Sequence, residues 1–586
     1  MNRALAAVSL LALGNGFAAV PALTVSLPIG TGPRMEWSPE VASLVLESSA
    51  RLGDAWTALL ANEVALTTNG LTVLAVDLRP AAESRFYRLR EVNPIGPVGG
   101  LAYDIGNPAW HDLYVDPVNG NDDNPGTGRT TAFRSIQAAF WSLPEGTQTR
   151  ATRIRLMPGT HAGAFLEDRR GTAEFPILIE PSDGPGTVVL RPTVQGDAGS
   201  LQFFRSAYAY VQDFHINVDG GDGIHWENCD HVLARRMRVN SRRSEGQDET
   251  VKVNQSQHVY IEDCDISDAG DNCIDIVAAQ YGHIVRCKIH NSSDWGAYLK
   301  GGSAYWVVEG NEIYDCGTGG FTAGQGTGFQ FMVAPWLHYE VYDVKVINNV
   351  IRDCEGAGLG VNGSYNVLLA HNTLYRVGSR SHVLEFVHGR RGCDGNDVGG
   401  CQPFVTAGGW GTTGEELQFI PNRNVQVVNN VIYNPAPFRS QYQQLEVPGA
   451  VVPPAGSNVA NPSRADDGLV LRGNVIFNGP ADWPLGIEEP DRGCQTGSCT
   501  AAQLRNDNRI NELEPAFANA AAGDFRPVGD LAAVATAPAP DFSWADAPTR
   551  PAVPAGNFAN AVVRDFSGAA RPAGSPPGAW LPRTGN

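Results

Sequence analysis

Short stretches in which apolar and polar residues alternate recur along the middle of the chain. Residues 259–266, 344–351 and 367–374 share one pattern, in which apolar residues at alternate positions are followed by a bend. The residues at the equivalent bend are Phe214, Met237, Cys264, Cys287, Asn311, Asn349, Asn372, Asn430 and Asn474. Their successive spacings are 23, 27, 23, 24, 38, 23, 58 and 44 residues. A basic period near 23 residues that is lengthened by insertions is typical of a solenoid.

The content of each repeat indicates the kind of solenoid. The repeats are short, alternating and rich in β-branched residues, and none contains a stretch long enough for a helix. Asn at the bend tolerates a left-handed backbone, and stacked amides can hydrogen-bond from turn to turn. Leucine-rich repeats share the period, but their leucine pattern is absent. We therefore predict an all-β fold, a right-handed parallel β-helix, with Asn311, Asn349 and Asn372 stacked at one bend.

The regions around the repeats predict further parts of the chain. Arg3, an apolar run and small residues after it indicate a secretory signal peptide, with an N-terminal helix of the folded domain as the alternative. Short alternating segments separated by turns then predict a small β-sandwich-like accessory module. The expected divisions are 1–22 for the signal peptide, 23–97 for the module, 98–200 for the β-helix cap and first rungs, 201–480 for its core with loop insertions, and 481–586 for a C-terminal cover.

Insertions and cysteines mark the loops. The repeat lengthens after Asn311, Asn372 and Asn430, and long loops on a rigid scaffold commonly build binding sites. The cysteines at 393 and 401 and those at 494 and 499 predict two loop disulfides in an exported protein, with zinc binding as the alternative. Cysteines at repeat-equivalent positions are expected to be buried thiols: Cys264, Cys287, Cys316 and Cys354.

Charge and hydropathy limit the partners. The formal net charge is −19, and no basic patch has the density that a nucleic acid requires. No stretch of about 20 apolar residues follows the N-terminal run, so we expect no transmembrane segment. We expect a secreted, extracellular monomer. An acidic chain can still bind an acidic substrate, because a local groove can carry the opposite charge.

One strand of each turn carries polar residues at alternate positions. The segments are 224–227, 251–254, 274–277, 297–300 and 329–331. If Trp226, Val253, Ile276 and Leu299 face the core, their neighbours face outward. The two outward columns are then His225, Lys252, Asp275 and Tyr298, and Glu227, Asn254, Val277 and Lys300. Because turns stack about 4.8 Å apart, we predict one polar patch in which His225, Lys252, Tyr298 and Gln330 bind a substrate.

An acidic cluster lies at the mouth of one of these turns. It comprises Asp271, Asn272 and Asp275, and Asp248 lies 23 residues before Asp271, which is one turn away. Carboxylates on adjacent turns suit a hard cation with oxygen ligands. The alternative is a set of solvated turn residues without an ion.

These residues resemble the calcium site of family 9 polysaccharide lyases, which include pectate lyases. Those enzymes are β-helices with an Asp on one turn, Asp-Asp-x-x-Asp on the next and a catalytic Lys on a later turn. The resemblance implies calcium bound by Asp248, Asp271, Asn272 and Asp275, with Asn272 in place of the middle Asp. It implies that Lys300, one turn after Asp275, is the catalytic base.

The chemistry expected from this resemblance is β-elimination from a uronic-acid polymer. Removal of the proton α to the carboxylate requires a base, and the carboxylate must be neutralised by a cation. The sequence therefore favours a polysaccharide lyase that uses calcium and acts on an acidic polysaccharide. Two other functions stay open on the same fold. One is a non-catalytic carbohydrate-binding or surface-interaction protein, and the other is a glycoside hydrolase or uronate epimerase.

Overall fold

The chain consists of two units, residues 1–98 and 99–586. The computed structural model describes the strands between residues 24 and 91, and residues 101–193, 199–241, 248–333, 336–393, 398–414, 417–455, 457–543, 554 and 559–582. The predicted signal peptide, 1–22, lies outside the described residues. Within the described part of the chain, no helix is long and apolar enough to cross a membrane.

The N-terminal unit contains two antiparallel sheets. One has the order β1 (Thr24–Ser26), β2 (Arg34–Trp37), β6 (Val73–Asp77) and β5 (Val64–Thr68). The other has the order β4 (Thr57–Ala58), β3 (Leu44–Ser49) and β7 (Phe86–Glu91). Two antiparallel sheets in so short a segment agree with the predicted β-sandwich-like module.

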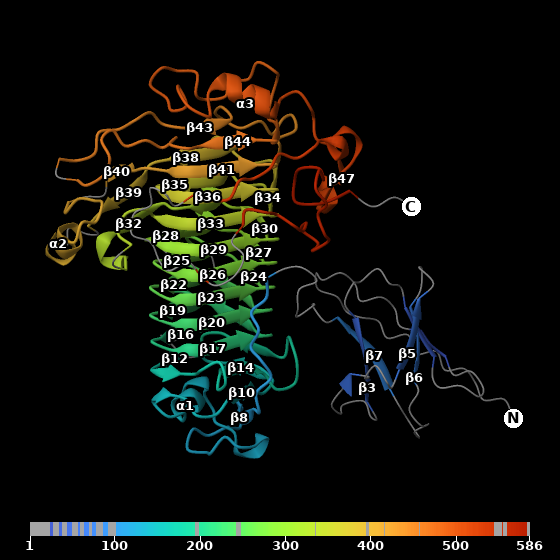
Figure 1. Ribbon diagram of the computed structural model, residues 1–586. Helices are drawn as coiled ribbons and strands as arrows, with labels where there is room; N and C mark the ends of the chain where they lie inside the picture. The colour runs from blue at the N-terminus through green and yellow to red at the C-terminus, as the bar shows by residue number, and fades with distance from the viewer. Residues whose placement is uncertain are drawn as a thin grey trace. The chain divides into compact units, whose positions relative to one another are not determined.

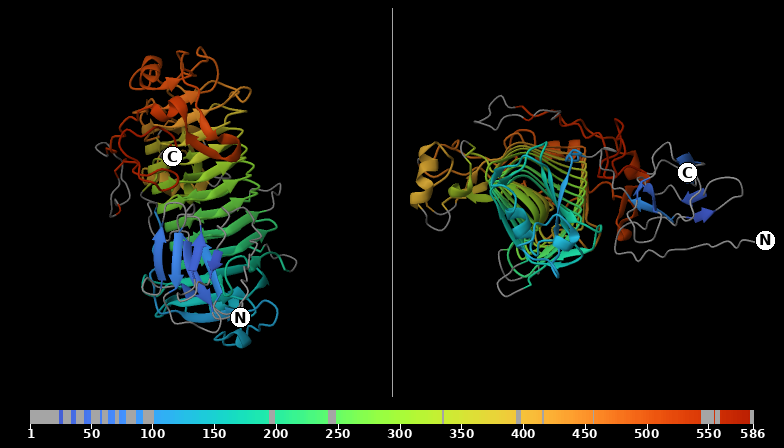
Figure 2. Two further views of the ribbon diagram at one scale, coloured as in Figure 1. Left: turned by 90° about the vertical axis from the view of Figure 1, so that its right-hand side faces the viewer. Right: turned by 90° about the horizontal axis from the view of Figure 1, so that it is seen from below.

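The second unit is a parallel β-helix whose turns each contribute one strand to three long sheets (Figure 1). The view along its axis in Figure 2 shows the three faces enclosing the core. The ten-stranded sheet contains β12 (Ala164–Glu167), β16 (Leu201–Phe204), β19 (Ile224–Glu227), β22 (Val251–Asn254), β25 (Ile274–Val277), β28 (Trp295–Lys300), β31 (Gly319–Ala323), β35 (Ala357–Asn362), β38 (Leu384–Val387) and β43 (Leu445–Glu446).

The other two sheets follow the same order along the axis. The twelve-stranded sheet contains β11 (Gly159–His161), β15 (Val188–Leu190), β18 (His215–Val218), β21 (Arg238–Ser241), β24 (Asp265–Ser267), β27 (Lys288–His290), β30 (Glu312–Tyr314), β34 (Val350–Arg352), β37 (Thr373–Tyr375), β42 (Val431–Tyr433), β45 (Val475–Phe477) and β46 (Arg509–Ile510). The fourteen-stranded sheet contains β8 (His111–Val115), β10 (Thr152–Leu156), β14 (Ile177–Pro181), β17 (Ala207–Gln212), β20 (Asp230–Arg235), β23 (Gln257–Glu262), β26 (Gln280–Val285), β29 (Ser303–Glu309), β33 (Val341–Ile347), β36 (Ser364–Ala370), β41 (Arg423–Val428) and β44 (Val470–Arg472), with β9 (Gly146–Thr147) and β13 (Arg169–Arg170) beside this path.

The core follows from alternation along the strands. Trp226, Val253, Ile276 and Leu299 all have 0% exposure, as predicted for the inward positions. Each buried side chain packs on its equivalents in the turns before and after it, so the core is one continuous column. The polar neighbours of these residues are thereby directed outward.

An asparagine ladder joins successive turns at one bend. The Nδ2 of Asn311 donates to the Oδ1 of Asn349 at 3.0 Å, and Asn349 donates to Asn372 in the same way at 3.0 Å. The row continues through Asn430 and Asn474. The predicted stacking of Asn311, Asn349 and Asn372 is confirmed, and the row also includes Asn508, which the repeat pattern did not mark.

Helices close both ends of the β-helix (Figure 1). At one end, within the predicted cap region 98–200, the helix is α1 (Ile136–Trp141), and the Oγ of Ser135 accepts the NH of Ala138 at its start. At the opposite end, α3 (Ala501–Asp507) buries Leu504 in the core. The C-terminal segment, with β47 (Phe517–Asn519) and β48 (Asp524–Pro527), packs on the outside through clusters around Val350 and Val431.

Two insertions form a lobe beside the ten-stranded sheet. Its sheet contains β32 (Gly326–Gly328), β39 (Gly389–Gly392) and β40 (Leu417–Ile420), and its helix is α2 (Val398–Thr406). The buried guanidinium of Arg391 pairs with Glu340, and both side chains have 0% exposure. The second Glu340 oxygen accepts the NH of Gly301 at 3.0 Å, so the lobe is tied to the turn that follows Lys300.

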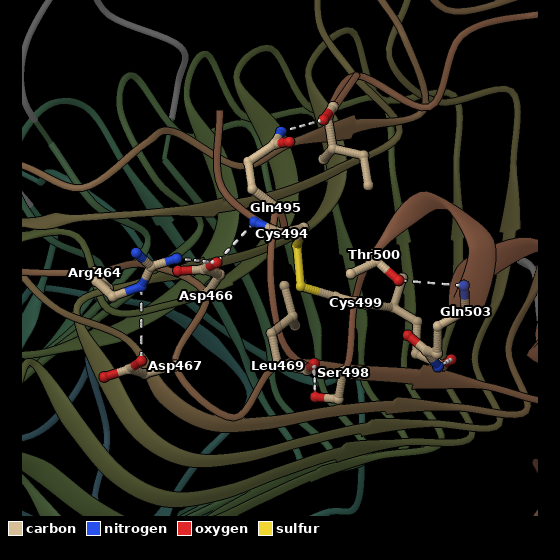
Figure 3. The surroundings of a disulfide bond; sticks show 12 residues. Arg464, Asp466, Asp467, Leu469, Cys494, Gln495, Ser498, Cys499, Thr500 and Gln503 are labelled. Carbon is tan, nitrogen blue, oxygen red and sulfur yellow. Dashed lines mark hydrogen bonds and ion pairs between the residues drawn. A yellow bond between two sulfur atoms is a disulfide. The ribbon is translucent and has the colours of Figure 1, made fainter. Parts of the chain in front are cut away.

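The cysteine predictions are confirmed. Cys393 is bonded to Cys401 in the lobe, and Cys494 is bonded to Cys499 beside Asp466 (Figure 3). Four repeat-equivalent cysteines are buried free thiols, as expected: Cys264, Cys287, Cys316 and Cys354.

The prediction of a strand at residues 329–331 is wrong. That segment is a 3-10 turn, Phe329–Phe331, and the corresponding strand of the β-helix is β31. Gly319 and Gly320 hid β31 from the sequence pattern, because glycine carries no strand signal. Both are required by close packing, since a Cβ on Gly319 would lie 2.3 Å from the Trp295 ring.

Candidate functional site

The two predicted outward columns exist on the ten-stranded sheet. His225, Lys252, Asp275 and Tyr298 are successive backbone partners on β19, β22, β25 and β28. The neighbouring column places Lys300 opposite Val277 on the preceding strand. Five polar side chains of the predicted site therefore lie on one face, although Gln330 does not join them.

Lys300 contacts Tyr298 from the adjacent column. Its Nζ donates to the Tyr298 Oη at 3.0 Å and to the Oε1 of Gln325 at 3.3 Å, and it lies 4.5 Å from the centre of the Tyr298 ring. Gln325 comes from the insertion after Asn311, which therefore borders Lys300. Gln325, and not Gln330, is the insertion residue in this contact.

Tyr298 is a buried phenol in an acidic environment. It is 3% exposed, and the Nδ2 of Asn272 donates to its Oη at 3.3 Å. Burial raises the pKa of Tyr298 well above its usual value, and the negative charges of Asp275, Glu249 and Asp271 add to this effect. Tyr298 therefore stays protonated at neutral pH and can donate a hydrogen bond.

Lys252 lies between two buried carboxyl groups. Its Nζ is 2.9 Å from the Oε2 of Glu249 and 3.6 Å from the Oδ2 of Asp275. Burial alone would lower the pKa of Lys252, but the charges of Asp275 and Glu249 raise it overall. Burial raises the pKa of Glu249 to about 9, and the charge of Asp275 is the second cause, so Glu249 retains its proton at neutral pH.

Glu249 was not among the predicted site residues. Its signal in the sequence is its position three residues before Lys252, across the bend that leads into β22. Glu249 was missed because the outward columns contain only strand residues and no residue of that bend.

Asp275 carries an unused ligand atom. The residue is 3% exposed, and its Oδ1 is buried without a hydrogen-bond partner. A buried carboxylate oxygen without a partner is costly unless a cation, a water molecule or a substrate donates to it. This atom is the strongest local indication that the site takes a further group.

Three aspartates line the bend before the sheet on successive turns. The NH of Asp271 donates to the backbone oxygen of Asp248 at 3.2 Å, and the NH of Asp294 donates to that of Asp271 at 3.0 Å. Burial raises the pKa of Asp271 to about 6, and the charges of Asp294 and Asp275 add to the effect. Asp294 was missed, although its distance of 23 residues from Asp271 carries the same repeat signal.

The predicted metal ligands do not gather as one compact set in this structure. Among the described residues, Asp248, Asp271 and Asp275 do not form a group with ligand atoms within 4.8 Å of one another. Asn272 is 1% exposed, and its Oδ1 accepts the NH of Trp295 at 3.0 Å. The calcium role of these four residues stays a prediction.

His225 and Gln330 lie at the margins of the site. The Nδ1 of His225 is 3.5 Å from the Oδ2 of Asp222, and burial lowers the pKa of His225. Gln330 is half-buried in the 3-10 turn and lies outside the outward columns. Substrate binding by either residue stays a prediction.

The outward column continues beyond Tyr298 to a second carboxylate region. Backbone pairing leads through Thr322 and Gly360 to Glu385 and Glu446. Burial raises the pKa of Glu385 to about 7, with the charges of Glu446 and Asp294 next. The absence of a side chain on Gly360 leaves space for Glu385, because a Cβ on Gly360 would lie only 3.2 Å from the Glu385 Oε1.

The fold and the site define a parallel β-helix protein with a carboxylate-rich face that also carries two lysines. A family model described as right handed beta helix region matches residues 222–403. This match and the stacked parallel sheets confirm the predicted right-handed parallel β-helix.

Individual proteins resemble parts of the chain. Alpha-1,3-galactosidase A of Akkermansia muciniphila is 34% identical over 74 residues, which cover 13% of this chain and 11% of that relative. Thus only about a tenth of the relative's length is matched.

Two solved structures have limited similarity to this chain. Pectate lyase Pel9A is 15% identical, with a TM-score of 0.34, and the match covers 75% of this chain and 94% of the Pel9A chain. The A-module of the Azotobacter vinelandii mannuronan C-5 epimerase AlgE4 is 12% identical, with a TM-score of 0.35, and the match covers 56% of this chain and 87% of the A-module.

Proposed function

We propose that this chain is a secreted polysaccharide lyase that cleaves a uronic-acid polymer by β-elimination. The observation that carries the proposal is the placement of Lys300, whose Nζ meets the protonated Tyr298 on the outer face of the sheet, one turn after Asp275. A proton acceptor, a proton donor and a lysine cation on two adjacent columns provide what an elimination requires.

The roles of the two lysines differ because their partners differ. Lys252 is held as an ammonium ion by Glu249 and Asp275, so it is suited to bind a uronate carboxylate. Of the described carboxylates, none lies within ion-pair distance of the Lys300 Nζ, whose hydrogen-bond partners are Tyr298 and Gln325. We assign Lys300 the role of base.

The elimination step can be written with these groups alone. The Lys300 Nζ takes the proton α to the uronate carboxylate, and the electron pair forms the new carbon–carbon double bond. The bond between the β carbon and the glycosidic oxygen breaks. Tyr298 is positioned to donate its phenolic proton to the departing oxygen, and Lys300 can return a proton to Tyr298 through their 3.0 Å contact.

Calcium is the cofactor that we propose for this site. The unpartnered buried Oδ1 of Asp275 and the carboxylates of Asp271 and Asp248 supply oxygen donors, which calcium prefers. When bound, calcium would neutralise the carboxylate of the substrate and so acidify its α proton. The residues of this chain would hold the substrate carboxylate beside Lys252 and Lys300.

The test is a panel of uronic-acid polymers incubated with the purified protein, with and without a calcium chelator. A lyase produces an unsaturated sugar end, which is read as a rise in ultraviolet absorbance. The proposal expects this signal on at least one polymer, its loss with chelator and its return with added calcium. If cleavage continues in chelator, calcium is excluded but the lyase assignment stands; if no polymer yields the unsaturated product, the lyase assignment is wrong.

A glycoside hydrolase is the second candidate, and a specific observation favours it. The pKa values of Asp271 and Glu385 are raised to about 6 and about 7, and Asp294 lies electrostatically close to both. Carboxyl groups whose pKa values are raised towards neutrality are suited to act as the general acid of glycoside hydrolysis. A hydrolase would release new reducing ends from the same panel without the ultraviolet signal.

A further inference from the structure

A row of aromatic side chains runs along the fourteen-stranded sheet, on a different face from the candidate lyase site. Its members lie at equivalent positions near the start of successive strands and have positive φ angles: Tyr208, His231, His258, Tyr281 and Tyr305. Their ring centroids are 4.2, 4.0, 5.0 and 5.6 Å apart in this order. The row therefore brings two imidazoles together on neighbouring turns.

The only carboxylate of the adjacent column lies beside these two imidazoles. The residues that precede the row, and pair with one another in the sheet, are Ala207, Asp230, Gln257, Gln280 and Ala304. The Oδ1 of Asp230 is 2.9 Å from the Nδ1 of His231 and 2.8 Å from the Nδ1 of His258. Both ring nitrogens are thus directed at one carboxylate oxygen.

We propose that Asp230, His231 and His258 form a binding site for a divalent transition-metal ion. One ligand atom of each residue lies within 4.8 Å of the other two. Bonds of about 2.0–2.2 Å to an ion place neighbouring ligand atoms roughly 3.0–3.4 Å apart, which is close to the two nitrogen–oxygen distances found here. Two imidazole nitrogens with one carboxylate suit zinc, nickel or copper, whereas calcium prefers an all-oxygen set.

The charges of the site favour a cation. Burial opposes ionisation of Asp230, but the hydrogen bonds from His231 and His258 hold its pKa well below the usual range. Asp230 is therefore a carboxylate at neutral pH. All three side chains are partly exposed, so an ion can reach them from solvent.

Binding requires two small local changes. Each Nδ1 must present its lone pair, so its proton moves to solvent or the ring adopts the tautomer with the proton on Nε2. The rings are inclined by 20° and must turn further apart, because an imidazole coordinates a metal in its own plane. Metal binding at this site accordingly displaces a proton from each Nδ1 that carries one.

The test is calorimetric titration of the full chain with Ni²⁺ at neutral pH. We expect saturable binding with one more site in the wild type than in the double variant His231→Gln/His258→Gln. The single variant Asp230→Asn keeps the side-chain shape and should weaken that site at least about tenfold, since even loss of a ligand's supporting partner costs that much.

A matched control is His290→Gln. His290 also contacts one aspartate, since its Nε2 is 3.1 Å from the Oδ1 of Asp265, but no second imidazole shares that oxygen. Its replacement should leave nickel binding unchanged. The inference is overturned if the wild type shows no saturable binding, or if its affinity and stoichiometry survive in the Asp230→Asn variant. Circular dichroism of each variant checks its fold, and the outcome is independent of the proposed lyase activity.

Discussion

Lys300 and Lys252 lie on neighbouring columns of one sheet but meet different partners. Lys252 lies beside two carboxyl groups, whereas Lys300 contacts a phenol and an amide. Removal of the Lys252 side chain and removal of the Lys300 side chain should therefore have different consequences, so their two roles can be distinguished by experiment.

Lys300→Met removes the proposed base and keeps most of the aliphatic bulk. We expect turnover of the polymer that the wild type cleaves to fall by at least about 100-fold, which is the usual scale for a lost general base. The melting temperature should change little, because Lys300 has no ion-pair partner among the described residues. Lys288→Met, on an exposed position of β27, is the control. Near-normal turnover of Lys300→Met would exclude Lys300 as the base.

Glu249 supplies a pH dependence of stability. Its pKa of about 9 in the folded protein is above that of an unfolded glutamate, so the folded state binds the proton more tightly. The stability contribution is therefore present below about pH 4.5 and is lost as pH rises towards 9. In Glu249→Gln this dependence is removed. Between pH 5 and pH 9, the melting temperature of the wild type should therefore fall relative to that of Glu249→Gln.

Sequence spacing predicts the position of most site residues but not their protonation. The period placed Lys252, Asp275, Tyr298 and Lys300 correctly because inward and outward positions alternate. It did not predict the hydrogen bond between Lys300 and Tyr298, or the pairing of Lys252 with Glu249. Those contacts depend on side-chain rotamers and burial, which a repeat pattern does not encode.

At the scale of elements, the lobe contains a fully buried ion pair. Arg391 on β39 and Glu340 before β33 are both fully buried, and Glu340 also accepts the hydroxyl of Thr327 at 2.6 Å. The pair joins the two insertions to the turn after Lys300. Its loss would affect stability and the position of that turn.

Arg391→Met leaves Glu340 buried without its cation. We expect the free energy of unfolding to fall by about 3–5 kcal/mol, the usual cost of breaking a buried pair. Arg390→Met changes an exposed neighbour on the same strand and should stay within about 0.5 kcal/mol of wild type. Adding Glu340→Gln to Arg391→Met should recover part of the loss. Urea unfolding measures all three, and equal stability of Arg391→Met and wild type would contradict this role.

The element that the sequence concealed is β31. Its two leading glycines fit beneath Trp295 and next to β35, and these contacts come from other turns of the chain. Because the need for glycine arises from non-local packing, alternation within the segment could not reveal the strand. The 3-10 turn that contains Gln330 was assigned to a strand for the same reason.

At the scale of the molecule, each turn of the β-helix depends mainly on its two neighbours. Asn372 illustrates this dependence, since it accepts hydrogen bonds from Asn349 and donates to Asn430. The period predicted this row, because only the bend position repeats the same residue. The lobe and the ends were not predictable in detail, because the repeat is interrupted there.

Asn372→Ala leaves buried groups of both neighbouring turns without partners. We expect a loss of about 2–5 kcal/mol, since an unsatisfied buried group costs about 1–3 kcal/mol. Hydrogen exchange should accelerate in β34, β37 and β42 more than in β10 or β14. Asn519→Ala, at an exposed position of β47, should change neither quantity. Uniform acceleration across all turns would contradict a nearest-neighbour solenoid.

The asparagine row also has a direction. Each amide oxygen receives from the turn before it, each amide nitrogen donates to the turn after it, and Asn508 ends the row by donating to the carbonyl of Leu504 in α3. An added turn with Asn at its bend would find a donor on one side and an acceptor on the other. A duplication between β37 and β42 would therefore lengthen the molecule without separating Lys300 from Asp275, whereas one between β25 and β28 would move them apart. A turn can therefore be added on the C-terminal side of the candidate site without changing the distance between Lys300 and Asp275.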